Sequence, residues 1–159
     1  MLIVSLDTSS QVSSVAVLSE ERVAAEVSMQ GALTHSETLM PHIELALQMA
    51  HAKKTELDGI AVSIGPGSFT GLRIGLAAAK MMAYALNIPM ICVPTLEALA
   101  CHYAGSVGLR ILPMMDAQKG NVYVQEFRWR PEGEDVRLSE EHPLSILPLT
   151  EVLDALVGT

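Results

Sequence analysis

The chain has 159 residues, half of them apolar and 18% charged, so it is long enough and apolar enough to bury the core of a globular domain. Its formal net charge of −8 disfavours direct binding of nucleic acid, because neutralisation of phosphates by Lys and Arg dominates that affinity. The two cysteines, Cys92 and Cys101, exclude a disulfide framework or a zinc-binding pattern, and no apolar run is long enough to cross a membrane. We therefore expect a cytoplasmic protein with neither a signal peptide nor a membrane span.

Three short strands open the chain. They cover Leu2–Leu6, Ser13–Leu18 and Arg22–Met29, and only tight turns separate them. Because no helix fits between these strands, we expect them to form an antiparallel meander.

Helices and strands then alternate. The expected elements are a helix from the capping box Thr34-x-x-Glu37 to about Ala52, a strand Gly59–Ile64, a helix from the N-cap Ser68 to about Leu86, a strand Met90–Val93 and a helix from about Thr95 to Tyr103. Crossover helices connect parallel strands, so the two later strands should run parallel to the first. This pattern predicts an α/β fold of the ribonuclease H type, with one mixed sheet in the strand order 3-2-1-4-5.

The pattern begins again in the second part of the chain. The apolar run Arg110–Met115 ends at Asp116 and is followed by the strand Val122–Phe127. In the same way Leu2–Leu6 ends at Asp7 before the second strand. The two aspartates therefore occupy equivalent positions in an internal repeat.

Two ribonuclease H-like halves are the plan of the actin-like ATPase (ASKHA) fold. We expect residues 1–105 to form the first subdomain and residues 106–159 to form the start of a second. Only a strand at Val136–Leu138 and a helix at Leu149–Val157 are expected after the repeated hairpin. The second subdomain is therefore predicted to be reduced or truncated.

The most distinctive stretch is the glycine-rich turn between the fourth strand and the next helix, Ser63–Gly75. It is not a P-loop, because the Gly-Lys-Ser/Thr that such a loop requires is absent. It is not a dinucleotide fingerprint, because Thr70 stands where a glycine is required, and it is not a nucleophile elbow, because Pro66 stands two residues before Ser68. The glycines beside Pro66 instead predict a tight turn that aims the helix.

Small residues recur at every fourth position along the helix after this turn: Gly71, Gly75, Ala79 and Ala83. Such a stripe lets a neighbouring helix approach closely, and interior glycines cost about 1 kcal/mol each relative to Ala, so a packing reason is expected. We predict a partner interface built by the first two helices, with the residues Leu39, Ile43, Leu47, Gly71, Leu72, Gly75, Leu76, Ala79 and Ala83. The alternative is that both helices pack only on their own sheet and on each other.

Five segments carry a family resemblance: Leu2–Ser9, His35–Pro41, Gly65–Gly75, Pro94–Leu99 and Asp116-Ala117. In this order they resemble the bacterial TsaB (YeaZ) family. The resemblance implies a role in the threonylcarbamoyladenosine modification of tRNA, as a non-catalytic scaffold or activator. It further implies pairing with a TsaD-like catalytic subunit of similar fold, a TsaE-like ATPase in the complex, and homodimers. From the residues we expect the homodimer to form through the same two helices, and from the net charge we expect only indirect contact with tRNA.

The sequence does not favour catalysis, metal binding or nucleotide binding by this chain alone. No two of the five histidines stand four residues apart, as a helical metal-binding pair would, and Cys101 and His102 are adjacent, so their side chains diverge. Asp7, Thr8 and Ser9 occupy the place of the first phosphate hairpin of actin-like ATPases, but the turn lacks the glycine that lets the backbone wrap a phosphate. We expect no catalytic or metal-binding residue and no nucleotide bound by the chain alone, while contact with ATP or ADP at an interface with the partner stays open. The alternative function is an actin-like ATPase or a glycoprotease-like metallohydrolase acting on its own.

Overall fold

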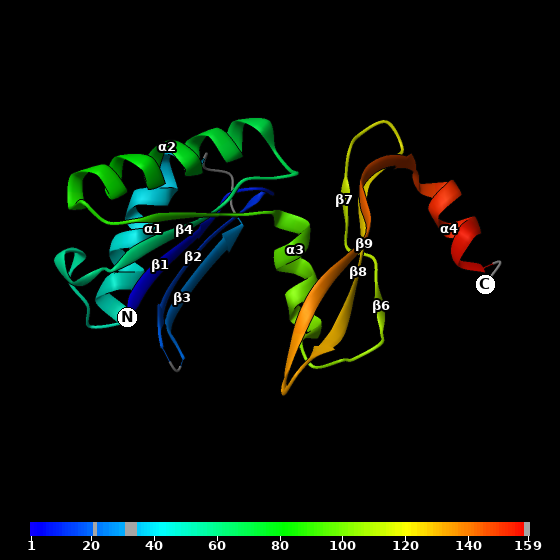
Figure 1. The fold of residues 1–159 in the computed structure, drawn as a ribbon. Helices are drawn as coiled ribbons and strands as arrows, with labels where there is room; N and C mark the ends of the chain where they lie inside the picture. Colours follow the sequence, from blue (N-terminus) through cyan, green and yellow to red (C-terminus); the bar gives the residue numbers. More distant parts are fainter. Residues whose placement is uncertain (21, 31–34, 158–159) are drawn as a thin grey trace. The chain divides into compact units, whose positions relative to one another are not determined.

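The computed structural model describes residues 1–20, 22–30 and 35–157. The chain divides into two compact units, Met1–Val93 (unit 1) and Pro94–Thr159 (unit 2), each with its own sheet and apolar core (Figure 1). The sequence placed this boundary later, after residue 105. The third helix belongs to unit 2 because Leu96 and Ala100 are fully buried in a cluster with Phe127.

Unit 1 has the mixed sheet that the sequence predicted. Its elements are β1 (Leu2–Asp7), β2 (Val12–Ser19), β3 (Val23–Gln30), α1 (His35–Met49), a short 3-10 helix η1 (Lys54–Glu56), β4 (Gly59–Ser63), α2 (Phe69–Leu86) and β5 (Met90–Val93). The strand order β3-β2-β1-β4-β5 is confirmed, with β1 antiparallel to β2 and parallel to β4, and with β4 parallel to β5. Thr34, the expected N-terminal cap of the first helix, lies outside the described residues.

One face of this sheet carries the core of unit 1. Alternate residues of β1 and β2, such as Leu6 and Val15, are buried on that face, because successive side chains of a strand point to opposite sides. They join one apolar cluster with Ile43 of α1 and Ala79 of α2. Each helix therefore buries one side against the sheet and leaves the other side to solvent.

Unit 2 is built around a long hairpin. Its elements are α3 (Thr95–Ala100), the 3-10 helix η2 (Cys101–Tyr103), β6 (Arg110–Ile111), β7 (Met114–Asp116), β8 (Asn121–Glu132), β9 (Asp135–Pro148) and α4 (Leu149–Val157). β6 and β7 pair with one edge of β8, and β9 pairs with the other edge, all of them antiparallel. Among the described helices of the chain, none is long and apolar enough to span a membrane.

β9 is the largest departure from the sequence expectation. It has 14 residues instead of the three of Val136–Leu138, because it pairs with β8 along nearly its whole length. The connection between the two strands is only Gly133-Glu134, and Gly133 has a φ of 66°, a left-handed conformation that glycine adopts without strain. Charged residues and prolines interrupt the apolar alternation of β9, so the sequence pattern concealed most of the strand.

The hairpins β1–β2 and β7–β8 share one local structure. Asp7 ends β1, and its Oδ1 accepts a hydrogen bond of 2.8 Å from the backbone N–H of Ser9. Asp116 ends β7, and its Oδ1 accepts one of 2.7 Å from the backbone N–H of Gln118. The elements also follow in the same order, β1-β2-β3-α1 in unit 1 and β7-β8-β9-α4 in unit 2. The internal repeat predicted from the two aspartates is confirmed at this level.

Candidate partner-binding face of unit 1

The glycine turn between β4 and α2 packs directly on the turn between β1 and β2. Gly65 and Gly67 have φ values of 108° and 156°, a region that L side chains rarely adopt. A Cβ on Gly67 would overlap the carbonyl oxygen of Ser9, so only glycine permits this approach. The backbone N–H of Ser68 donates a hydrogen bond of 2.7 Å to the same carbonyl. The glycines therefore join the two turns.

α2 begins at the predicted N-cap. The Oγ of Ser68 accepts a hydrogen bond of 3.2 Å from the backbone N–H of Gly71. The hydroxyl of Thr8 donates one of 2.8 Å to the carbonyl of Gly71, and both Thr8 and Ser9 are buried. The predicted phosphate hairpin, Asp7 to Ser9, thus uses these groups for contacts within unit 1.

The predicted interface residues fall into two groups. Buried in unit 1 are Leu39, Ile43, Leu47, Gly71, Gly75 and Ala79, and half-buried are Leu72, Leu76 and Ala83. The buried six are closed to a partner, so the predicted interface is wrong at those positions. Cβ atoms on Gly71 and Gly75 would overlap Thr8, which explains the small residues by the close approach of α2 to the first hairpin. The small residues Gly71 and Gly75 of α2 therefore face the chain's own first hairpin and not a neighbouring helix of a partner.

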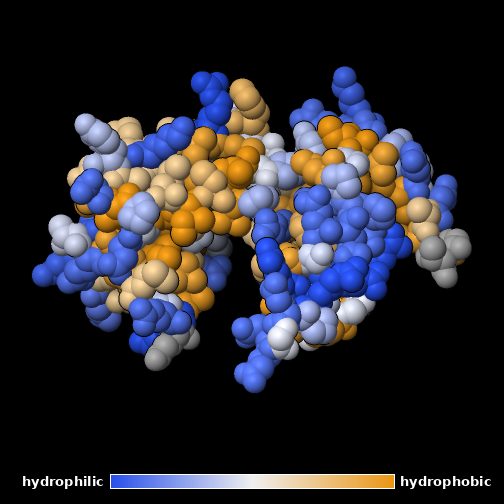
Figure 2. Space-filling view, viewed as in Figure 1, coloured by the Kyte–Doolittle hydropathy of each residue, from blue (hydrophilic) through white to orange (hydrophobic). Residues whose placement is uncertain are grey.

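The opposite side of α2 exposes large apolar side chains. Phe69 is 75% exposed, Met81 74% and Tyr84 91%, and the guanidinium carbon of Arg73 lies 5.4 Å from the centre of the Phe69 ring. α1 packs beside α2 and exposes further apolar residues, and Figure 2 shows apolar surface over α2 in unit 1. We call the exposed side of α2 the helix face; its residues are Phe69, Arg73, Lys80, Met81 and Tyr84. Single exposed apolar residues are common, whereas several on one side of a helix make that side a candidate contact surface.

The charged residues of α2 could have revealed the helix face. Arg73 and Lys80 are the only charged residues in this helix, and both are exposed, so they mark its solvent side. Tyr84 follows Lys80 by four residues and Met81 follows Arg73 by eight, which places them on that side. The prediction instead placed the partner interface on the opposite side of α2, because small residues recur there at every fourth position.

The described residues hold no group of three or more His, Cys, Asp and Glu side chains that could bind a metal ion. His42 is buried, with its Nδ1 3.0 Å from the Oγ of Ser13 and its Nε2 3.1 Å from the Sδ of Met29. Burial raises the pKa of the Cys101 thiol, and the charge of Glu97 raises it further, so the reactive thiolate is disfavoured.

Several known proteins are similar to this chain in fold and in sequence. The solved structure of YeaZ from Pseudomonas aeruginosa superposes with a TM-score of 0.77 at 28% identity, over 92% of this chain and 67% of that chain. The tRNA threonylcarbamoyladenosine biosynthesis protein TsaB of Bacillus subtilis (strain 168) is 37% identical over 130 residues, which cover 82% of this chain and 56% of the relative. The protein of the same name from Escherichia coli (strain K12) is 31% identical over 134 residues, 84% of this chain and 58% of the relative. With the 3-2-1-4-5 sheet and the repeated hairpin, these likenesses define an α/β protein of the actin-like class.

Residues 27–142 match the protein family described as "TsaD: tRNA N6-adenosine threonylcarbamoyltransferase". With its curated relatives, the chain belongs to the TsaB (YeaZ) family within this group. It spans 56% and 58% of the length of the two curated relatives.

Proposed function

We propose that the chain is a non-catalytic subunit that supports a TsaD-like catalytic subunit in the transfer of threonylcarbamoyl to adenosine in tRNA. Its curated relatives carry the name of tRNA threonylcarbamoyladenosine biosynthesis proteins, which supports the pathway. The net charge of −8 favours tRNA contact through the partner, because an acidic surface repels phosphates. A TsaE-like ATPase joins the pair, and the complex acts in the cytoplasm.

The helix face is the observation that carries this proposal. Burying a large apolar side chain contributes about 1.5–3 kcal/mol, so Phe69, Met81 and Tyr84 together favour association strongly. All charged residues of α2 are basic, so the partner should present acidic side chains opposite Arg73 and Lys80. Homodimers use the same surface, and a homodimer and a complex with the catalytic subunit therefore exclude one another.

We assign no nucleotide to the chain alone. The engagement of Thr8 and Ser9 with the start of α2 supports this assignment, and contact of the Asp7–Ser9 turn with ATP or ADP belongs to the interface with the partner. Isothermal titration with ATP, on the chain alone and on the complex, tests the assignment. Saturable binding by the chain alone would contradict it.

Reconstitution of tRNA modification tests the proposed function. Purified TsaD-like and TsaE-like proteins are assayed with and without the chain, and threonylcarbamoyladenosine in tRNA is quantified by mass spectrometry. We expect modification to depend on the chain. If the TsaD-like enzyme modifies tRNA equally well without it, the proposal fails.

Two variants test the contact surface separately from the function. Met81→Asp and Tyr84→Asp should weaken binding of the TsaD-like subunit about tenfold or more, because each places a carboxylate in an apolar interface. Val136→Asp is the matched control, since Val136 is an exposed apolar residue of unit 2. Unchanged binding by both α2 variants would place the contact elsewhere while leaving the reconstitution result intact.

A further inference from the structure

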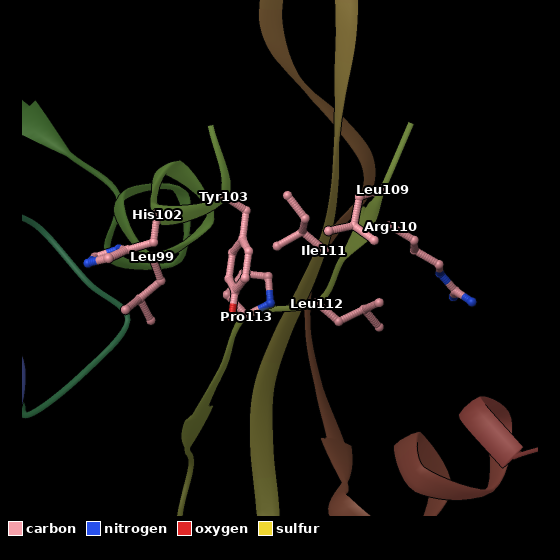
Figure 3. A pocket seen from close by; sticks show the side chains of 8 residues that line it. All are labelled: Leu99, His102, Tyr103, Leu109, Arg110, Ile111, Leu112 and Pro113. Carbon is pink, nitrogen blue, oxygen red and sulfur yellow. The ribbon is translucent and has the colours of Figure 1, made fainter. Parts of the chain in front are cut away.

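A hollow of about 550 Å³ in unit 2 has polar residues in its wall, but their polar groups do not converge. The wall is formed by Leu99, His102, Tyr103 and the segment 109–113 (Figure 3). In Figure 3 the ring of His102, the ring of Tyr103 and the guanidinium of Arg110 point in three different directions. A ligand site needs a few polar groups directed at one point. We therefore assign no ligand to this hollow, whereas polar groups do converge in unit 1.

His42 of α1 bridges the two outer strands of the sheet in unit 1. Ser13 of β2 and Met29 of β3 stand directly opposite each other in the antiparallel pair. The Nδ1 of His42 lies 3.0 Å from the Oγ of Ser13, and its Nε2 lies 3.1 Å from the Sδ of Met29. His42 and Ser13 are buried, whereas Met29 is 55% exposed. Of these three residues, the methionine is therefore the one that a solute can reach.

The two partners fix the position of the proton on the His42 ring. A thioether sulfur can accept a hydrogen bond but has no hydrogen to donate, so Nε2 carries a proton. In the neutral ring Nδ1 is then an acceptor, and the hydroxyl of Ser13 donates to it. Because the ring is held at both nitrogens, its Nε2–H stays directed at the sulfur of Met29.

This hydrogen bond makes the two sides of the Met29 sulfur unequal. A thioether sulfur has two lone pairs, and oxidation at one or the other gives the two epimers of a chiral sulfoxide. The Nε2–H of His42 engages one lone pair, and the buried imidazole ring stands on that side of the sulfur. An oxidant from solvent can therefore reach the other lone pair more easily.

We propose that Met29 is a site of reversible oxidation, at which a hydroperoxide forms one sulfoxide epimer in large excess. The open lone pair of the sulfur attacks one peroxide oxygen, so that an S–O bond forms and the O–O bond breaks. The sulfur loses two electrons, and a proton shift releases the second peroxide oxygen as water or an alcohol. Each class of methionine sulfoxide reductase acts on one epimer. One class alone, with two electrons from a pair of thiols, therefore restores the thioether and releases water. The proposal does not depend on the proposed function.

Met49 provides a matched comparison within the same unit. It is the last residue of α1 and is 53% exposed, and no hydrogen bond to its sulfur is present among the described residues. Both of its lone pairs are open, so Met49 should give the two epimers in similar amounts. Cleavage after glutamate separates the two sites, because residues 27–37 contain Met29 as their one methionine and residues 45–56 contain Met49.

The test oxidises the folded full chain briefly with hydrogen peroxide at neutral pH. The two peptides are then treated with each reductase class, and the remaining sulfoxide is quantified by mass spectrometry. One class should remove about ten times as much Met29 sulfoxide as the other, whereas the two classes should remove similar amounts of Met49 sulfoxide. Equal removal of Met29 sulfoxide by both classes would overturn the proposal. So would a Met29 that stays unoxidised while Met49 reacts, because its sulfur would then be closed to the oxidant.

Further arms of the experiment test whether His42 causes the excess. Oxidation of the chain unfolded in urea should give both Met29 epimers equally, and so should oxidation of folded His42→Ala. Ser13→Ala keeps the imidazole but removes the hydroxyl that holds its Nδ1, so it should lower the excess and serves if His42→Ala does not fold. An excess that persists unchanged in urea or in the folded variant would overturn the proposal.

Discussion

Replacing Gly75 by alanine should destabilise unit 1, although alanine is normally preferred in a helix. At an interior helix position alanine is favoured over glycine by about 1 kcal/mol. At Gly75 the added Cβ would overlap the Oγ1 of Thr8, a buried hydroxyl that donates a hydrogen bond of 2.8 Å to the carbonyl of Gly71. Thr8 must therefore move, and this hydrogen bond is lost.

The magnitude of the effect follows from three contributions. Overpacking a core costs about 1–3 kcal/mol, and an unpaired buried polar group costs about 1–3 kcal/mol more. The gain of about 1 kcal/mol in helix propensity offsets part of this. The free energy of unfolding should thus fall by about 1–5 kcal/mol.

The sign should reverse when the obstructing oxygen is removed. After the oxygen, the atom of Thr8 nearest to the added Cβ is its own Cβ at 3.5 Å, an ordinary contact. In a Thr8→Ala background, Gly75→Ala should therefore stabilise the chain by about 1 kcal/mol. A double-mutant cycle isolates this coupling.

Urea unfolding followed by far-UV circular dichroism measures these changes. Helices α1 and α2 hold 15 and 18 residues, against 6 and 9 in α3 and α4, so this signal reports mainly on unit 1. Ala77→Gly, at an exposed position of α2, is the control and should lose about 1 kcal/mol from propensity alone. The reasoning is refuted if Gly75→Ala is as stable as the unchanged chain, or if its effect has the same sign in both backgrounds.

Two ion pairs of unit 2 allow further tests. Arg110→Met should lower the free energy of unfolding of unit 2 by about 1–3 kcal/mol in urea, because it leaves the carboxylate of Glu126 without its bidentate partner. Adding Glu126→Leu should restore most of this loss. If the double variant recovers no stability, the reasoning is contradicted. Hydrogen bonds from Arg130 lower the pKa of Glu141 below its ordinary value of 4.5, so this pair stabilises the fold above that pH and the contribution disappears as the pH falls through the lowered value. Glu141→Gln should therefore be less stable than the unchanged chain at neutral pH and match it in acid; a pH-independent difference would argue against the pair.

The sheet of unit 1 was predictable because its order follows from local rules. Short turns force a meander over the first three strands, and crossover helices force the next two strands to be parallel. The N-cap Ser68 was equally local, since a serine before a helical run favours a cap. These inferences need no knowledge of what lies across the fold.

The candidate site depended on contacts that the local pattern does not contain. The stripe through Gly71 and Gly75 shows that one side of α2 is approached closely, but only the position of Thr8 shows that the neighbour is the chain's own hairpin. The length of β9 likewise depends on its pairing with β8. This pairing keeps β9 a single strand although the strand contains Pro143 and several charged residues.

The single tryptophan of the chain, Trp129, lies in the core of unit 2, whereas most helical residues lie in unit 1. Indole emission and helical ellipticity therefore report on different cores of the same molecule. Two superimposable transitions would make the chain one cooperative system, and two separate ones would make it a pair of thermodynamic domains. A variant that shifts one signal and not the other identifies the core that it affects, without any added label.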